Sequence, residues 1–270
     1  MAKVYDLDFG FSKLAQVVKS VPAQESLREF MVQRYDFFKD VFLTLTLQSG
    51  NFPYINSQDF ARFCREIKVI DKTINQSRID TIVSYVKAKP KGVDLQKLPK
   101  QGPLDLSRFE FLEALVRVAI AKYKDLGPST SAISIQEAFE QLYNENILPN
   151  FTPAPWQVFR DEELWTREVN LVFFDNAEGL KKLYQRYCSG VTQKVSYESA
   201  IKLLTVDFSI QLDKFDAIYC YGMSLSTCSD LFKMTHLKLL SMSYEEFLEM
   251  IARTADVHFK DSEFEARPLW

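Results

Sequence analysis

The sequence is short of the residues that binding loops and metal sites usually need. Its 270 residues include only 8 glycines, too few for many tight turns or glycine-rich phosphate loops, so helices are favoured over sheet. The 4 cysteines show no CxxC spacing and there are only 2 histidines, which argues against a zinc site. We therefore expect free thiols in a reducing compartment.

Signals for membranes, nucleic acid and catalysis are also missing. No run of about 18 apolar residues occurs and the N-terminal residues lack an apolar signal core, so we expect a soluble, cytoplasmic protein without a membrane partner. A net charge of −3 gives no electrostatic case for nucleic acid. No glycine-rich phosphate loop, GxSxG or HExxH pattern occurs, and the carboxylates form no convergent pattern, so we expect a non-enzyme without a cofactor.

The clearest positive feature is a nine-residue stretch that occurs twice. Residues 111–119 (FLEALVRVA) reappear at 247–255 (FLEMIARTA) with five identities at an offset of 136. From Ile79 to Ala119 the two copies align without a gap. Hydrophobic residues make up 47% of the chain, enough for packed cores, so the repeat predicts two related helical modules.

The first copy is predicted to hold two helix–loop–helix units. A capping box at Ser26 and Glu29 indicates a helix that ends near Gly50, and Asn56 is typical of the start of the next helix. Each loop carries one apolar residue, Ile55 and Leu106, and we expect these two to form a short antiparallel contact. The order is similar to that of paired EF-hands.

The second copy repeats the order, with Val195 in the place of Ile55 and Met242 in that of Leu106. Between the copies, a capping box at Ser134 opens a connecting helix, and a proline-rich stretch follows. The fold class is therefore predicted to be all-α. The predicted parts are an N-terminal arm (1–25), a first pair (26–124), a connecting helix and linker (125–163), a second pair (164–256) and a tail (257–270).

Calcium chemistry is not expected in the four loops. An EF-hand loop needs oxygen ligands at positions 1, 3 and 5 and a bidentate glutamate at position 12. With the apolar residue set as position 8, no loop has a carboxylate at 1, 3 or 5, while Asp59, Glu110 and Glu246 stand at position 12. We interpret the two glutamates as caps of helix N-termini and expect no metal binding.

The stretch Phe109-Glu110-Phe111-Leu112-Glu113-Ala114-Leu115-Val116-Arg117-Val118-Ala119 resembles a motif of calmodulin-like proteins with degenerate EF-hands from ciliary and flagellar axonemes. The resemblance covers about residues 26–124 and 164–256. It implies a structural or adaptor part, such as docking of dynein arms or binding to doublet microtubules, and a cytoplasmic location in the axoneme.

Two sets of residues are candidates for binding protein partners. EF-hand pairs bind amphipathic helices in a groove, and whether the grooves here are open or closed is left undecided. The candidate groove residues are Phe38, Phe42, Phe63, Ile82 and Phe111 in the first copy and Leu183, Phe215, Ile218 and Phe247 in the second. The second set is a lysine-rich loop that could contact acidic tubulin tails or remain solvated: Lys87, Lys89, Lys91, Lys97 and Lys100.

Two ion pairs are also predicted, Glu113 with Arg117 and Glu249 with Arg253, each four residues apart on one helix. They either support the helix alone or also fix the two hands or grip a target helix. The sequence thus favours a non-catalytic adaptor that docks onto a dynein-docking complex, a coiled coil or tubulin. The alternative is a calcium-responsive regulatory subunit that binds an amphipathic helix.

Overall fold

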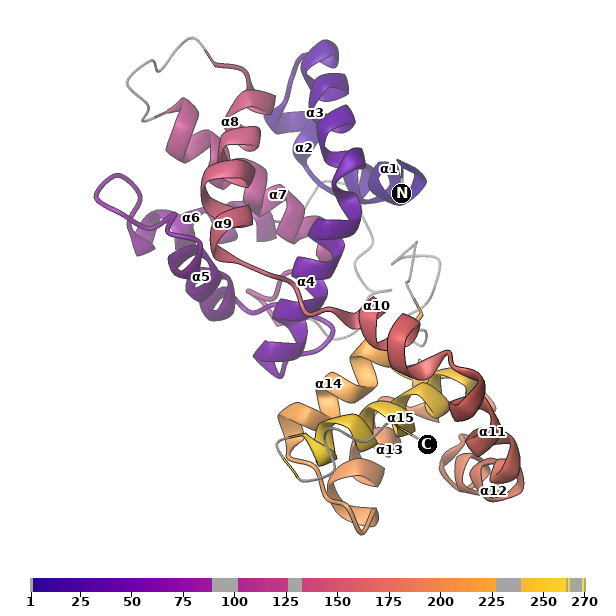
Figure 1. The fold of residues 1–270 in the computed structure, drawn as a ribbon. Helices are drawn as coiled ribbons and strands as arrows, with labels where there is room; N and C mark the ends of the chain where they lie inside the picture. The colour runs from indigo at the N-terminus through magenta and orange to yellow at the C-terminus, as the bar shows by residue number, and fades with distance from the viewer. Residues whose placement is uncertain are drawn as a thin grey trace. The chain divides into compact units, whose positions relative to one another are not determined.

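The fold is described from a computed structural model, for residues 2–88, 102–125, 133–226, 239–260, 262 and 269. These residues are mostly helical and contain one short pair of strands, so the predicted all-α class is confirmed (Figure 1). The chain divides into two compact units, unit 1 (Met1–Ala154) and unit 2 (Pro155–Trp270). The division falls inside the proline-rich stretch, and the connecting helix belongs to unit 1.

Unit 1 consists of helices and short π-helical turns joined by loops. Its elements are α1 (Ala2–Phe11), α2 (Leu14–Val17), α3 (Val21–Gln33), α4 (Tyr35–Ser49), α5 (Ser57–Glu66), α6 (Gln76–Lys87), α7 (Arg108–Ala119), η2 (Ile120–Lys124), α8 (Ile135–Gln141), η3 (Leu142–Ile147) and α9 (Leu148–Asn150).

Local sequence signals explain several helix ends of unit 1. Gly50 ends α4 with a φ of 66°, a left-handed conformation that glycine adopts without strain. The Asn56 side chain accepts the Asp59 amide at 2.8 Å and caps α5, as predicted. Ser134 and Glu137 form the predicted capping box at the start of α8.

The prediction that a helix begins at Ser26 is wrong. The capping box there does not form, because α3 already begins at Val21 after Ser20, with Pro22 in its first turn, where its missing N–H costs nothing. Ser26 lies inside α3 and its hydroxyl donates to Gln136 of α8 at 2.9 Å. The predicted single helix is also interrupted at Arg34, which separates α3 from α4.

The predicted contact between the two loops of the first copy is confirmed. The Ile55 amide donates to the Leu106 carbonyl at 3.1 Å and the Leu106 amide donates to the Ile55 carbonyl at 2.7 Å, in an antiparallel bridge. Both side chains are fully buried. The bridge therefore joins the loop before α5 to the loop before α7.

The N-terminal arm is helical and is tied to α7 by a buried ion pair. Asp8 of α1 accepts from Arg108 Nε at 2.7 Å and from Arg108 Nη2 at 3.0 Å. The Tyr35 hydroxyl also donates to Asp8. Both charged side chains are at least 94% buried, so loss of either partner would leave an uncompensated charge buried between α1 and α7.

Unit 2 has a similar order of elements. They are α10 (Trp156–Phe159), η4 (Arg160–Leu164), α11 (Arg167–Asp175), α12 (Ala177–Tyr187), β1 (Val195–Ser196), α13 (Tyr197–Lys202), η5 (Leu203–Asp207), α14 (Lys214–Ser224), β2 (Ser241–Met242) and α15 (Tyr244–Phe259).

The two strands of unit 2 pair antiparallel, with Val195 opposite Met242. These are the residues that the sequence places in the positions of Ile55 and Leu106, and both are fully buried. Leu203, Ile218 and Phe247 are buried as well. The helices that follow the two strands, α13 and α15, contact them, so the paired loops of unit 2 lie against its helices.

Candidate partner-binding surfaces

The candidate groove residues of the first copy lie inside the core of unit 1. Phe38, Phe63 and Phe111 are fully buried, Ile82 is 5% exposed and Phe42 is half-buried. The Phe111 ring lies 5.7 Å from that of Phe42 and 5.9 Å from that of Phe63. Phe42, Phe63 and Phe111 therefore form one aromatic cluster within the core of unit 1, whereas Ile82 lines a small surface pocket beside Thr81 and Tyr85.

The chain's own residues 133–151, here called the closing segment, cover this cluster. Phe139 and Tyr143, one helical turn apart, place their ring centroids 5.4 and 5.7 Å from that of Phe38. At the end of the segment, Phe151 meets Phe63 edge-on at 5.0 Å. A partner helix could therefore reach Phe38 or Phe63 only if the closing segment moved away.

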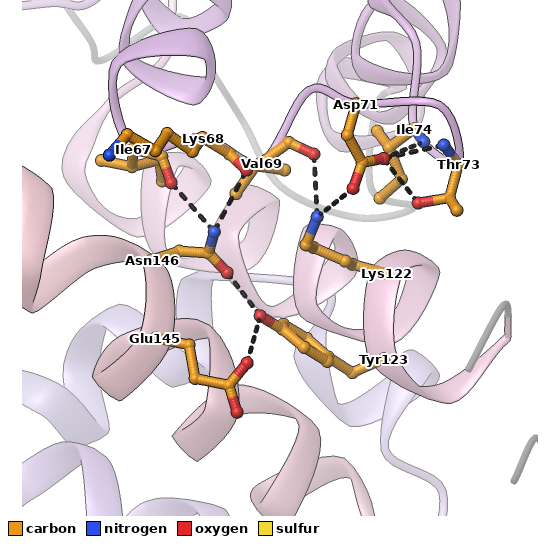
Figure 2. Close-up of polar contacts among 10 residues, drawn as sticks. All are labelled: Ile67, Lys68, Val69, Asp71, Thr73, Ile74, Lys122, Tyr123, Glu145 and Asn146. Carbon is orange, nitrogen blue, oxygen red and sulfur yellow. Dashed lines mark hydrogen bonds and ion pairs between the residues drawn. The ribbon is translucent and has the colours of Figure 1, made fainter. Parts of the chain in front are cut away.

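Polar contacts fasten the closing segment to the turn between α5 and α6 (Figure 2). The Asn146 side chain, 6% exposed, donates to the carbonyls of Ile67 at 2.9 Å and Lys68 at 3.2 Å. The Asn146 side-chain oxygen accepts a hydrogen bond from the Tyr123 hydroxyl at 2.5 Å. The same hydroxyl lies 3.2 Å from a carboxylate oxygen of Glu145, which shares its proton. Burial, with Glu145 nearby, raises the pKa of Tyr123, so this hydroxyl stays protonated as a donor.

A second set of contacts holds the same turn to η2 (Figure 2). Lys122 Nζ donates to the Val69 carbonyl at 3.2 Å and to Asp71 at 2.8 Å. Asp71 also accepts the Thr73 hydroxyl at 2.6 Å and the amides of Thr73 and Ile74. The Lys122 ammonium, and then the Thr73 hydroxyl, hold the pKa of the Asp71 carboxyl well below its usual range.

The candidate groove residues of the second copy are divided between the interior and the surface of unit 2. Ile218 and Phe247 are fully buried and Leu183 is half-buried. Phe215, in the first turn of α14, is 59% exposed. Its counterpart at the offset of 136, Ile79, is fully buried. Of the candidate groove residues, Phe215 is therefore the most accessible to a partner.

Both predicted glutamate–arginine pairs form, and each glutamate has an additional donor. Glu113 accepts from Arg117 Nε at 2.8 Å and from the backbone amide of Lys13 at 2.7 Å. Both carboxylates lie at equivalent positions and are at least 90% buried. The Glu113 and Glu249 carboxylates therefore each hold the segment that precedes their own helix–loop–helix pair. The four-residue spacing of glutamate and arginine alone does not reveal this role.

The second pair shows how that fixing works in unit 2. Glu249 accepts from Arg253 Nε at 2.9 Å and from Arg160 Nε of η4 at 2.9 Å. Arg253 in turn donates to the Trp156 carbonyl at 2.8 Å and lies 4.5 Å from the centroid of the Phe159 ring. The pair therefore anchors α10 and η4 against α15.

The carboxylates at position 12 are used within the protein. Glu110 accepts the Ser107 amide at 2.8 Å and forms a capping box with Ser107 at the start of α7. Glu246 does the same for Ser243 at the start of α15, and Asp59 pairs with Arg62 at 2.8 Å. The interpretation of the two glutamates as helix caps is confirmed. Among the residues described, no group of three or more His, Cys, Asp or Glu side chains is placed to hold a metal ion.

The lysine-rich loop is described at Lys87 alone. Lys87 Nζ pairs with Glu110 at 2.8 Å, and its side chain is 13% exposed, so this lysine stabilises unit 1. The other four lysines predicted to contact a partner lie outside the described residues: Lys89, Lys91, Lys97 and Lys100.

Three of the four cysteines are described, and all three are free thiols. Burial raises the pKa of the Cys220 thiol to about 12 and that of Cys64 further, so both are poor nucleophiles. Cys188 is half-exposed, and Cys228 lies outside the described residues. Within the described ranges, no helix is long and apolar enough to cross a membrane.

Comparison with known proteins gives no match to a family model, to a curated protein or to a solved structure.

Proposed function

We propose that the chain is a non-catalytic adaptor built from two EF-hand-like helix–loop–helix pairs that arose by internal duplication. Three features support the duplication at equivalent positions. The loops pair through Ile55 with Leu106 and through Val195 with Met242. Capping boxes open α7 and α15, and both helices carry a buried glutamate–arginine pair. These features favour one ancestral unit used twice.

One observation supports a binding role: unit 2 exposes several large apolar side chains to solvent. Trp165, Phe174 and Phe215 are 64%, 76% and 59% exposed. On α11, Phe174 and the 48% exposed Leu171 stand three residues apart and share one side of the helix, and contiguous exposed apolar side chains commonly mark sites of protein interaction. Since the position-12 glutamates serve as helix caps, binding is proposed to need no metal.

The proposed setting is the ciliary or flagellar axoneme, with a dynein-docking subunit, a coiled coil or tubulin as partner. Support comes from the resemblance of residues 109–119 to a motif of degenerate calmodulin-like axonemal proteins. The lysines between residues 87 and 100 add a local positive charge that suits acidic tubulin tails.

Co-sedimentation of the purified full chain with isolated, salt-washed doublet microtubules tests this function. We expect saturable binding that is the same with calcium and with a calcium chelator. Binding that appears only with calcium would favour the regulatory sensor instead. No saturable binding under either condition would reject the axonemal adaptor.

A further inference from the structure

Both units contain the same interruption between two helices. In unit 1, Arg34 separates α3 from α4 with φ −116° and ψ 11°. In unit 2, Asn176 separates α11 from α12 with φ −103° and ψ 10°. The two bends have nearly the same backbone conformation, so positions can be matched by counting from Arg34 and from Asn176.

Residues at matched positions before Arg34 and before Asn176 are buried to a similar degree. Leu27 and Met31, seven and three residues before Arg34, are fully buried. At the matching positions before Asn176, Val169 is 3% exposed and Phe173 packs partly buried against the cluster of Leu164 and Ala252. The same register therefore faces the core in both units.

The adjoining face is covered in unit 1 by α8, which lies beside α3 (Figure 1). Phe30, four residues before Arg34, is 6% exposed because Phe139 and Tyr143 lie over it, with ring centroids at 5.9 and 5.8 Å. Phe37 meets Tyr143 at 5.5 Å. Two aromatic side chains one turn apart therefore cover the bend.

In unit 2 the matching positions are open. Val172 takes the place of Phe30 and is 39% exposed. Gly179 takes the place of Phe37, and a Cβ atom added there would meet nothing within 4 Å. Leu180 takes the place of the fully buried Phe38 and is only half-buried, and α12 has no buried residue. Beyond α15 only Lys260, Ser262 and Leu269 are described, so no described helix takes the place of α8.

Charge indicates which kind of helix would fit there. On α12, Lys182 pairs with Glu178 at 2.6 Å, which leaves the exposed Lys181 and Arg186 as an excess of positive charge. The helix that covers the matching face of unit 1, residues 135–150, carries three glutamates and no lysine or arginine. An acidic helix would complement the basic α12.

We propose that the face formed by Val172, Gly179 and Leu180, the open face, docks an acidic amphipathic helix of a partner protein. That helix presents two aromatic side chains one turn apart, as Phe139 and Tyr143 do on unit 1. This inference rests on the proposed adaptor function and adds the unit, the face and the chemistry of the partner.

Photo-crosslinking with a synthetic peptide tests the open face. The probe is residues 133–151 of this chain with a benzophenone amino acid in place of Tyr143, added to the full chain, and the crosslinks are mapped by mass spectrometry. We expect crosslinks within residues 167–187. Gly179→Glu, which adds bulk and repulsive charge to the open face, should weaken binding at least about tenfold.

Gly190→Glu is the matched control, because a Cβ atom at Gly190 also meets nothing within 4 Å and the residue lies outside the open face. It should bind the peptide as the unmodified chain does, and circular dichroism melting should show both variants folded. Binding that is equal in both variants, or no stronger than that of a scrambled peptide, overturns the proposal.

Other occupants give different results. Crosslinks within residues 21–49 mean that the peptide replaces the closing segment in unit 1, which overturns the proposal. A dimer in sedimentation velocity that Gly179→Glu dissociates makes a second copy of the chain the occupant, which also overturns it. Doublet binding that is unchanged by Gly179→Glu rejects the open face as the docking site and leaves the adaptor function standing.

Discussion

Asn146 and Ile67 are joined by a 2.9 Å hydrogen bond although 79 residues separate them in the chain. The carbonyls of Ile67 and Lys68 lie just past the end of α5, where no helical amide reaches them, and Lys68 adopts a φ of 56°. The Asn146 amide satisfies both carbonyls. Asn146 therefore holds the closing segment to the end of α5 through polar contacts, in addition to the aromatic contacts that Phe139 makes.

Asn146→Ala should loosen the closing segment. The substitution leaves the buried Ile67 carbonyl without a donor, which costs about 1–3 kcal/mol. Hydrogen exchange of the amides in α5 and α8 measures the effect locally, which is needed because the two units can unfold separately. Asn144→Ala, at an exposed position of η3, is the control and should change protection by less than about 0.5 kcal/mol. Equal losses in both variants would contradict the function given to Asn146.

Arg108→Met should destabilise unit 1 strongly. It leaves the Asp8 carboxylate, 1% exposed, without its cation, and breaking a buried ion pair in this way costs about 3–5 kcal/mol. The measurement is exchange protection of α1 and α7. A second variant, Asp8→Asn with Arg108→Met, removes the stranded charge and should recover most of the loss. If the double variant were no more stable than the single one, the ion pair would not be what holds α1.

Asp71→Asn should destabilise unit 1 in a pH-dependent way. The pKa of Asp71 is lower in the folded protein than its ordinary value of 3.8, so its stabilisation is complete above about pH 4 and is lost as the pH falls through the folded-state pKa. The effect should stay below about 1 kcal/mol, because the side chain is 44% exposed.

Thermal melts of the unmodified chain and Asp71→Asn at several pH values test this. The difference in Tm should be constant from about pH 7 to about pH 5 and shrink in more acidic buffer. In a Lys122→Met background the substitution should matter less, because the ammonium that lowers the pKa of Asp71 is gone. A difference in Tm that grows toward acid pH would contradict a lowered pKa of Asp71 in the folded protein.

The features of the fold that local signals encode could be predicted. The bridge between Ile55 and Leu106 follows from one apolar residue in each of two short loops, because neither can be buried alone. The boxes at Ser134 and at Ser107 with Glu110 follow from residue type and spacing.

Features that depend on tertiary contacts could not be predicted. Ser26 and Glu29 have the spacing of a capping box, yet the helix already starts after Ser20, with Pro22 in its first turn. The bend at Arg34 has no proline or glycine to mark it. The amphipathic pattern of α8 shows that one face is buried but not that it covers Phe38, which decides that the first groove is closed.

We infer that these helix pairs keep their shape through apolar contacts and internal hydrogen bonds, without a metal ion in their loops. Isothermal titration of the full chain with calcium, together with melting curves in calcium and in chelator, tests it most directly. We predict no saturable heat at micromolar calcium and the same Tm in both buffers. Stoichiometric binding with micromolar affinity and a higher Tm in calcium would contradict the claim.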